Sequence, residues 1–410
     1  MKKSILKILA SIQAIIALII VVCGCKQLIT PATVTTYPVI NITATSVVCG
    51  GNVSGNGNGT ISAYGVCYST GNNPPSITDN ITTNGSGVTS FSTTLTGLTQ
   101  STKYYLRAYA TNEEGTFYGG TTTFTTTGFC VPLISNSSTN LFGVYFTDAN
   151  NGWAVGNGNI LNTNNGGTNW TPQTNPTNSQ LNAVYFSNTF NGCAVGYNGT
   201  ILTTTNGGSN WAIQNSGSPT PVLFGVSFTS TNSGYAVGSG GTILNTINGG
   251  TSWVPQIIST TNTLFSICFA NATTGYAVGA NGTILNTTNG GGNWFPQTSG
   301  TANDLYGVCF INATTGWAVG NNGTILSTTN GGGSWSPQTS NTNYFLRSVY
   351  FVNATTGYAV GNSGTLLTTS NGGSAWVAQI SGTGNALNSV FATSQQNYIV
   401  GNVGTILQFN

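Results

Sequence analysis

Few side chains in the C-terminal two-thirds of this 410-residue chain could take part in acid–base chemistry. Between residues 128 and 410 the charged side chains are Asp148, Asp304 and Arg347, and the whole chain contains no histidine. General acid–base catalysis needs a titratable group at the reacting atom, and glycoside hydrolysis needs two carboxylates that face each other. We expect Asp148 and Asp304 on connections at opposite faces of the fold. The sequence therefore predicts no catalytic residue and no enzyme activity.

Asp304 and Arg347 carry opposite charges. The sequence between residues 128 and 410 is a repeat, and its regular spacing would place these two residues close together. Asp304 stands one residue before, and Arg347 one residue after, the start of equivalent strands in neighbouring repeats. We therefore expect both near the axis of the fold and on the same face. Two interpretations stay open: an ion pair at the axial rim, worth about 0–1 kcal/mol, or an anchor for a ligand.

The cysteines suggest packing and one candidate disulfide. Cys49 and Cys67 lie in two short β-type segments of the N-terminal region, and an exported protein can form a bridge between them, the alternative being two buried thiols. Cys130 and Cys193 replace aromatic residues of the repeat, so we expect them to pack. No metal site and no cofactor are predicted, because histidine and C-x-x-C are absent and Asp148 lacks the spacing of a calcium loop.

The N-terminus has the features of an export signal. A basic start is followed by an apolar run that ends in small residues, which is the pattern of a signal peptide. The residues VCGC at 22–25 resemble a bacterial lipobox, and the resemblance implies a lipid on Cys25 that anchors the protein to a membrane. We expect a signal peptide at 1–24, an anchor linker at 25–36 and a place in the bacterial cell envelope, with the outer membrane, surface or periplasmic face left open. An uncleaved membrane helix is the alternative.

The charge balance excludes nucleic acid as a partner. Lys and Arg number seven, of which three leave with the signal, so four basic residues face five acidic ones in the mature chain. Binding to nucleic acid would need clustered Lys and Arg. Charged residues make up 3% of the chain, against about 25% in an ordinary domain, but regular apolar spacing and 10% aromatic residues indicate a folded all-β protein.

A repeat of about 41 residues runs through residues 128–410 and must position the side chains above. Each unit reads L-x-x-V-x-F, G-x-A-V-G, G-T-I-L-x-T and N-G-G-x-x-W. A period in the forties that is made of short strands is typical of a β-propeller with four strands per blade. The sequence predicts a seven-bladed propeller whose first strands line the axis. The units start at Leu141, Leu181, Leu223, Leu264, Leu305, Leu346 and Leu387.

The turn N-G-G-x-x-W recurs for a structural reason. Asn-Gly supports the positive φ values of a tight hairpin, and the Asn side chain can accept hydrogen bonds from backbone amides of the turn. The motif resembles the Asp-box of sialidases, with Asn in place of Asp, and the resemblance implies a structural turn away from any active site. The Asn positions are Asn165, Asn206, Asn248, Asn289, Asn330 and Asn371, and the Trp positions are Trp170, Trp211, Trp253, Trp294, Trp335 and Trp376.

The last unit stops at "GTILQFN" and lacks a fourth strand. An unpaired strand at that point would leave the ring with an exposed edge. The residues "CVPLIS" at 130–135 align with "WVPQII" at 253–258. We therefore expect residues 130–135 to supply the missing strand as an N-terminal latch.

Residues 37–127 form a separate predicted domain of short strands and Gly/Asn/Ser turns. Leu98, Thr102 and Tyr104 fit the pattern L-x-x-x-T-x-Y, and the segment resembles a fibronectin type III domain. The resemblance implies a β-sandwich in which the Tyr104 hydroxyl fixes a corner between two strands.

The propeller repeat resembles the family of photosystem II stability and assembly factors, whose blades carry the same G-T-I-L-x-T-x-N/D-G-G-x-x-W run. The photosynthetic members bind a membrane protein through a basic region that this chain lacks, so photosystem assembly is not carried over. Two functions stay open. The first is a non-catalytic protein-binding or scaffolding surface formed by the Asn/Ser/Thr-rich loops between repeats, such as 174–180, 215–222 and 299–304. The alternative is a lectin-like carbohydrate-binding, or residual glycan-hydrolysing, propeller.

Overall fold

A computed structural model describes residues 28–100, 102–217, 221–393 and 396–409. The chain divides into two compact units, one that ends at Thr127 and one that begins at Gly128. Within the described residues, helix is limited to five single 3-10 turns, and no helix is long and apolar enough to cross a membrane. The predicted signal peptide and Cys25 lie outside the described residues.

The N-terminal unit is a sandwich of two antiparallel sheets. One sheet has the order β1-β2-β5, and in the other β6 pairs with β3, β7 and β8 while β4 pairs with β3. The strand bounds are β1 (Thr33–Thr36), β2 (Val47–Gly55), β3 (Ala63–Ser69), β4 (Asn80–Ile81), β5 (Ser90–Leu95), β6 (Lys103–Asn112), β7 (Gly115–Tyr118) and β8 (Thr122–Thr125).

Alternating apolar residues of both sheets face each other to form the core of the sandwich. The hydroxyl of Tyr104 accepts a hydrogen bond of 3.0 Å from the backbone N–H of Thr99, and its ring stacks on Phe124. β1 lies within the segment predicted to be a linker, where Val34 packs against this core. The folded unit therefore begins before the expected residue 37.

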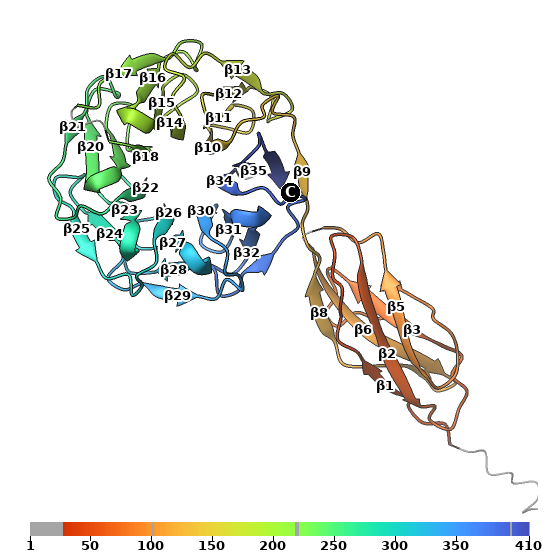
Figure 1. Cartoon of the computed structure of the whole chain (residues 1–410). Coiled ribbons are helices and arrows are strands. Elements are labelled where there is room, and N and C mark those ends of the chain that lie inside the picture. Colours follow the sequence, from red (N-terminus) through yellow and green to blue (C-terminus); the bar gives the residue numbers. More distant parts are fainter. Residues whose placement is uncertain (1–27, 101, 218–220, 394–395, 410) are drawn as a thin grey trace, which may run out of the picture. The chain divides into compact units, whose positions relative to one another are not determined.

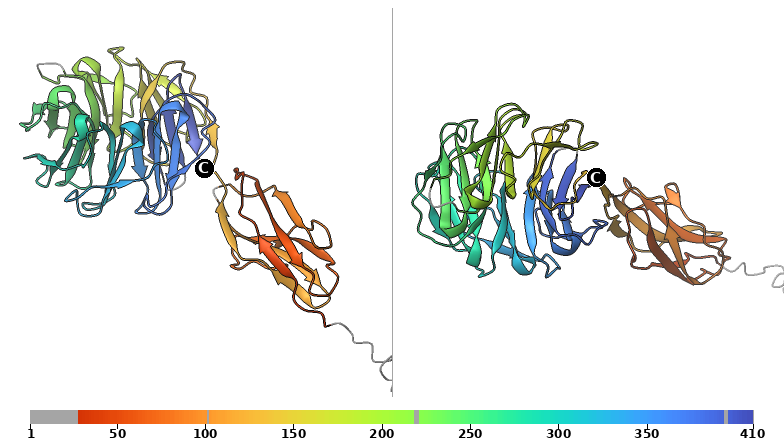
Figure 2. Two further views of the ribbon diagram at one scale, coloured as in Figure 1. Left: turned by 60° about the horizontal axis from the view of Figure 1, so that its bottom comes forward. Right: turned by 45° about the horizontal axis from the view of Figure 1, so that its top comes forward.

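The C-terminal unit is a β-propeller of four-stranded antiparallel sheets arranged around a central axis (Figure 1). The tilted views in Figure 2 show the ring from its sides. We number the sheets 1 to 7 in chain order. The bounds in sheets 1 to 4 are β10 (Leu141–Phe146), β11 (Gly152–Gly156), β12 (Ile160–Thr163), β13 (Thr171–Gln173); β14 (Leu181–Phe186), β15 (Gly192–Gly196), β16 (Ile201–Thr204), β17 (Ala212–Gln214); β18 (Leu223–Phe228), β19 (Gly234–Gly238), β20 (Thr242–Thr246), β21 (Val254–Pro255); β22 (Leu264–Phe269), β23 (Gly275–Gly279), β24 (Ile284–Thr287), β25 (Phe295–Gln297).

The remaining sheets continue the series. Their strands are β26 (Leu305–Phe310), β27 (Gly316–Gly320), β28 (Ile325–Thr328), β29 (Ser336–Gln338); β30 (Leu346–Phe351), β31 (Gly357–Gly361), β32 (Leu366–Thr369), β33 (Val377–Ala378); β34 (Leu387–Ala392), β35 (Asn397–Gly401), β36 (Ile406–Phe409) and β9 (Cys130–Pro132). The 3-10 turns between second and third strands are η1 (Tyr197–Gly199), η2 (Ser239–Gly241), η3 (Ala280–Gly282), η4 (Asn321–Gly323) and η5 (Asn362–Gly364).

Sheet 7 combines the two ends of this unit. β9 pairs antiparallel with β36, so that Pro132 faces Leu407 and Cys130 faces Phe409. The backbone N–H of Leu133 extends the pairing with a bond of 2.8 Å to the Ile406 carbonyl. Pro132 lies on the outermost strand of the sheet, a place where a missing N–H donor is tolerated.

The third and fourth strands of each of sheets 1 to 6 are joined by the Asn-Gly-Gly turn. In sheet 1 the Oδ1 of Asn165 accepts hydrogen bonds of 3.0 Å from the Thr163 hydroxyl and from the Asn169 backbone N–H. Gly166 and Gly167 both have positive φ, which glycine adopts without steric cost. The other five turns repeat these bonds with Asn206, Asn248, Asn289, Asn330 and Asn371.

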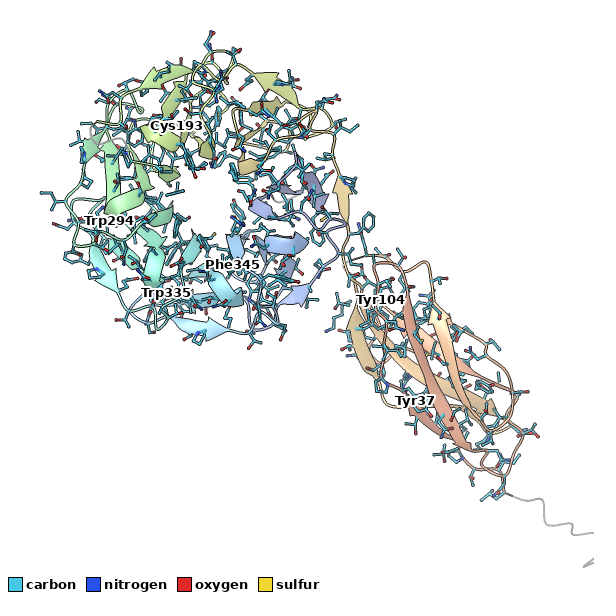
Figure 3. All side chains as sticks on the ribbon, in the orientation of Figure 1. Tyr37, Tyr104, Cys193, Trp294, Trp335 and Phe345 are labelled. Carbon is cyan, nitrogen blue, oxygen red and sulfur yellow. The ribbon has the colours of Figure 1, made fainter. Side chains whose placement is uncertain are left out.

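The tryptophan after each turn is buried against the phenylalanine that ends the first strand of its own sheet. Trp335 meets Phe310 edge-on at 5.9 Å between ring centroids, and Trp294 meets Phe269 at 6.0 Å. Both tryptophans lie in the outer part of the ring (Figure 3). The equivalent residues Trp170, Trp211, Trp253 and Trp376 make the same contact.

The antiparallel order gives the ring two faces. We call the loop face the one formed by the connections between sheets together with the 3-10 turns. We call the turn face the opposite one, which carries the Asn-Gly-Gly turns and the connections between first and second strands.

Candidate binding surface at the axial mouth

A β-bulge in the first strand of every sheet turns one side chain toward the axis. The pairing between first and second strands shifts after the leading leucine, which leaves the next residue as the extra one. We call the set of these residues, which line the central pocket on the loop face, the axial mouth. Its members are Phe142, Asn182, Phe224, Phe265, Tyr306, Arg347 and Asn388.

Aromatic rings form a continuous arc along part of the axial mouth. Phe224 and Phe265 lie 5.4 Å apart between ring centroids, and Phe265 and Tyr306 lie 4.8 Å apart. Phe345, from the loop that enters sheet 6, continues the series at 6.5 Å from Tyr306. Sequence reasoning missed this arc, although the second position of L-x-x-V-x-F is aromatic in four of the seven repeats.

Two other members of the axial mouth hold neighbouring sheets together. The Nδ2 of Asn182 donates a bond of 2.7 Å to the Leu223 carbonyl of sheet 3, and the Nδ2 of Asn388 donates one of 2.7 Å to the Leu141 carbonyl of sheet 1. The latter bond joins the last sheet to the first. These two asparagines therefore stabilise the contacts between sheets. The aromatic rings and Arg347 are the members of the axial mouth that can contact a ligand.

Of the two interpretations of Asp304 and Arg347, the ion pair is not formed. The Oδ1 of Asp304 accepts a hydrogen bond of 2.8 Å from the Asn281 backbone N–H, whereas the Nε of Arg347 donates one of 2.7 Å to the Oδ1 of Asn362. Each charged group is thus held by a polar neighbour of its own, and register alone did not fix the direction of either side chain. The ligand-anchor interpretation remains for Arg347, which lines the central pocket.

Both charges act on the hydroxyl of Tyr306. Burial raises the pKa of this phenol, the carboxylate of Asp304 raises it further, and the guanidinium of Arg347 opposes the increase. Burial also lowers the pKa of Arg347. Beside them, the Oδ1 of Asn321 is buried and has no hydrogen-bond partner among the described residues. The axial mouth thus offers the cation of Arg347 beside the phenol of Tyr306, which is part of the aromatic arc.

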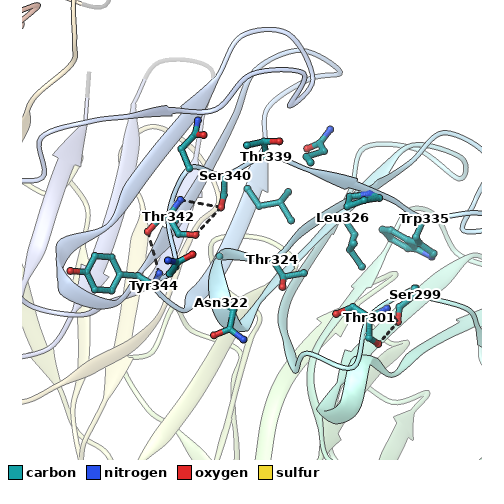
Figure 4. Close-up of a pocket in the computed structure, with 17 residues that line it drawn as sticks. Ser299, Thr301, Asn322, Thr324, Leu326, Trp335, Thr339, Ser340, Thr342 and Tyr344 are labelled. Carbon is teal, nitrogen blue, oxygen red and sulfur yellow. Dashed lines mark hydrogen bonds between the residues drawn. The ribbon is translucent and has the colours of Figure 1, made fainter.

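A groove of about 980 Å³ on the loop face runs along sheet 5. Figure 4 shows its lining of hydroxyl and amide side chains, among them Ser299, Thr301, Asn322 and Thr342. Tyr344, whose side chain is 53% exposed, lines the groove, and the next residue, Phe345, belongs to the aromatic arc. The groove and the axial mouth therefore share one loop.

Of the two alternatives for Cys49 and Cys67, the structure has two buried free thiols and no bridge. Cys49 belongs to the core between the two sheets of the sandwich. On β3, Tyr64 and Val66 face that core, so Cys67 points to the other side of its sheet, with its Sγ 3.5 Å from the Arg107 carbonyl. Burial raises the pKa of Cys49 to about 12 and also raises that of Cys67, which keeps both thiols protonated at neutral pH.

No group of three or more potential metal ligands exists among the described residues. Asp148 caps its own loop on the turn face, where its Oδ1 accepts the backbone N–H groups of Asn150 and Asn151 at 2.8 and 2.9 Å. It lies on the face opposite to Asp304. The propeller therefore brings no two carboxylates together.

Solved structures share the propeller fold. YCF48 from Cyanidioschyzon merolae is 23% identical, with a TM-score of 0.59 over 68% of this chain and 98% of that one. YCF48 bound to D1 peptide is 21% identical, with a TM-score of 0.59 over 69% and 94%. A catalytically inactive virginiamycin B lyase from Staphylococcus aureus with quinupristin is 12% identical, with a TM-score of 0.61 over 68% and 98%. At these identities the likeness shows the fold alone. No curated protein sequence matches.

The sequence of the propeller also matches a family model, described as photosynthesis system II assembly factor YCF48. The matches cover residues 132–221, 218–295, 253–336 and 297–379. Together they extend without a gap from residue 132 to residue 379, which is more than half of the chain. The chain therefore belongs to the YCF48 family of photosynthesis system II assembly factors.

Proposed function

We propose that this chain is a lipid-anchored protein of the bacterial cell envelope whose propeller binds a protein partner and catalyses no reaction. The observation that carries the proposal is the axial mouth, where the aromatic arc stands beside Arg347, the one basic residue between positions 128 and 410. Aromatic and arginine side chains are the residues that most often dominate protein–protein binding. A related propeller, YCF48, has been solved with a D1 peptide.

The partner segment should be extended and carry an acidic group. Arg347 donates its hydrogen bond to Asn362 through Nε, so the rest of its guanidinium can meet a carboxylate. Rings of the aromatic arc would cover apolar side chains of the same segment. The groove of sheet 5, joined to the axial mouth through Tyr344 and Phe345, would accommodate the continuing backbone with its hydroxyl and amide groups.

We infer further that the sheets form a closed seven-bladed ring at residues 128–410, with residues 130–135 as the latch. The pairing of β9 with β36 and the Asn388–Leu141 bond support this closure. We also infer that the sandwich is a fibronectin type III-like domain, which the two-sheet architecture and the Tyr104 contact support.

The lyase likeness does not favour a catalytic function here. That structure was made inactive by replacing a histidine with alanine, and the present chain has no histidine. Its two propeller carboxylates lie on opposite faces and cannot act as a catalytic pair.

Carbohydrate binding is the second candidate, because the groove of sheet 5 is lined by hydroxyl and amide groups with an exposed tyrosine.

A test that separates peptide binding from carbohydrate binding uses the chain from Lys26 onward on a random peptide array and on a glycan array. We expect saturable binding of acidic peptides that weakens at least about tenfold in Arg347→Gln, equivalent to about 1.4 kcal/mol. Lys103→Gln, which removes the same charge from the sandwich, is the control. Glycan binding without peptide binding would replace the proposal.

The anchor is tested separately in cells. We expect radiolabelled palmitate to be incorporated into the full-length protein and to be lost in Cys25→Ser, which would then appear in the soluble fraction. Equal labelling of both forms would overturn the lipid anchor.

A further inference from the structure

An aromatic ring fills the boundary between most neighbouring sheets on the turn face. The residue at the second position of G-x-A-V-G stacks on the phenylalanine that ends the first strand of the next sheet. Trp317 and Phe351 lie 3.4 Å apart between ring centroids, and Trp153 and Phe186 lie 3.5 Å apart. The other stacked pairs are Tyr235–Phe269, Tyr276–Phe310 and Tyr398–Phe146.

Four of these five rings also donate a hydrogen bond to the Asn-Gly-Gly turn of the next sheet, whereas the Tyr276 hydroxyl donates to the Ala313 carbonyl. The Nε1 of Trp153 donates to the Gly207 carbonyl at 3.1 Å, and the Nε1 of Trp317 donates to the Gly372 carbonyl at 3.1 Å. The Tyr398 hydroxyl donates to the Gly166 carbonyl at 2.9 Å. In all four cases the acceptor is the first glycine of an Asn-Gly-Gly turn.

The boundary between sheets 2 and 3 lacks this ring. Cys193 stands at the aromatic position (Figure 3), and a pocket of about 330 Å³ opens beside it. Phe228, the phenylalanine that would receive the ring, forms one wall, and Thr203 and Tyr185 line the pocket as well. The ring of Tyr185 lies nearly parallel to that of Phe228, but at 5.7 Å between centroids it is farther away than the rings at the other boundaries. Substitution of an aromatic residue by cysteine has thus left a space that the fold fills elsewhere with an indole or a phenol.

The acceptor at this boundary is unused too. No donor among the described residues bonds to the carbonyl of Gly249, the glycine equivalent to Gly207 and Gly372. At three other boundaries a glutamine donates to this position, as Gln173 does to Gly207 at 3.0 Å. The equivalent Gln214 turns instead to the Thr203 hydroxyl at 2.8 Å.

We propose that this pocket binds a tryptophan or tyrosine side chain of a partner polypeptide. The ring would stack on Phe228, and its N–H or O–H would donate to the Gly249 carbonyl, as Trp153 does one boundary away. Exposed Asn248 and Thr251 stand at the entrance and can bond to the backbone that carries the ring. Burial keeps the Cys193 thiol neutral by raising its pKa, so the floor of the pocket is uncharged.

This site lies on the turn face and is separate from the axial mouth. The proposal for this pocket rests on the proposed function in one respect, namely that the ligand is part of a polypeptide. Loss of peptide binding at the axial mouth would leave the pocket unaffected, and the two are therefore tested with different probes.

The test uses the full chain after its signal and a fluorine-labelled probe, N-acetyl-5-fluorotryptophanamide, observed by ¹⁹F NMR. We expect saturable broadening with wild-type protein, loss of binding in Cys193→Trp and retention in Cys193→Ala, because the first fills the pocket and the second does not. N-acetyl-4-fluorophenylalaninamide, which lacks the donor, should bind at least about fivefold more weakly, a difference of about 1 kcal/mol. No binding to wild type, or equal binding to Cys193→Trp, would overturn the proposal.

A second variant keeps the proposal testable if Cys193→Trp does not fold. Trp153→Cys should create an equivalent pocket between sheets 1 and 2, and the number of probe molecules bound per chain should rise from one to two. An unchanged number in folded Trp153→Cys would contradict the proposed geometry. Tighter binding of free 5-fluoroindole than of the amide would assign the pocket to a small molecule and overturn the polypeptide as occupant.

Discussion

The indole Nε1 of Trp335 in sheet 5 donates a hydrogen bond of 3.2 Å to the Oε1 of Gln297 in sheet 4. The Nε2 of the same glutamine donates to the Gly331 carbonyl at 2.9 Å. One side chain thus satisfies a buried indole and a turn carbonyl of the next sheet. Gln338 and Trp376 repeat this arrangement between sheets 5 and 6.

Gln297→Ala should lower the free energy of unfolding of the propeller by about 1–3 kcal/mol, because it leaves a buried donor and an acceptor unpaired. Gln256 is the matched control, since its Nε2 contacts only the carbonyl of Val254, at 3.4 Å. Gln256→Ala should change stability by less than about 0.5 kcal/mol. All eight tryptophans lie between residues 153 and 376, so tryptophan fluorescence during urea unfolding follows the propeller alone. Equal losses in the two variants would contradict the glutamine bridge.

Leu133 stands at the glutamine position of the strand that completes sheet 7. Its N–H bonds to Ile406 just as that of Gln256 bonds to Ile243, and the next indole, Trp170 Nε1, has no partner among the described residues. Leu133→Gln should supply that partner and exceed Leu133→Ala in stability by about 1 kcal/mol or more. Urea unfolding of the two variants side by side tests this. If Leu133→Gln is no more stable than Leu133→Ala, the residue does not occupy the equivalent position.

The sequence was sufficient to predict the propeller because the same motifs for the strands, the turn and the buried tryptophan recur from repeat to repeat. Each repeat therefore gives separate evidence for the same fold. Side-chain direction was not predictable in the same way. The equivalent positions of Asp304 and Arg347 indicated their shared face correctly, but each side chain bonds to a local polar group instead of to the other. Cys67 was assigned to a strand, yet strand alternation turns it away from Cys49. The sequence shows that Cys193 replaces an aromatic residue of the repeat. It does not show whether neighbouring side chains fill the space of the missing ring, so the pocket could not be predicted.

The Asn371 turn should depend on a carbonyl acceptor and not on charge. Its Oδ1 accepts hydrogen bonds of 2.9 Å from the Thr369 hydroxyl and from the Ala375 N–H. Asn371→Asp retains this acceptor and should change the free energy of unfolding by less than about 0.5 kcal/mol. Asn371→Ala removes it and should cost about 1 kcal/mol, as the loss of a capping side chain does. Thermal unfolding distinguishes the cases, and an aspartate variant as unstable as the alanine variant would show that the Nδ2 group is needed.

Tyr276 should make the propeller sensitive to alkaline pH. Burial raises the pKa of its hydroxyl to about 12, with a smaller contribution from Cys268, and the hydroxyl donates to the Ala313 carbonyl at 2.9 Å. A folded-state pKa above the unfolded value of about 10 favours the protonated phenol in the native state. Its contribution to stability is therefore complete below pH 10 and is lost as pH rises toward 12.

Tyr276→Phe removes this titration while keeping the ring on Phe310. The difference in unfolding free energy between wild type and Tyr276→Phe should be constant from pH 7 to about pH 9.5 and should shift in favour of the variant above it. Urea unfolding at several alkaline pH values measures that difference. Phenolate absorbance of the two native proteins should show that Tyr276→Phe has one tyrosine fewer with a raised pKa than the wild type. Parallel pH profiles for the two proteins would mean that Tyr276 ionises as readily in the folded as in the unfolded chain.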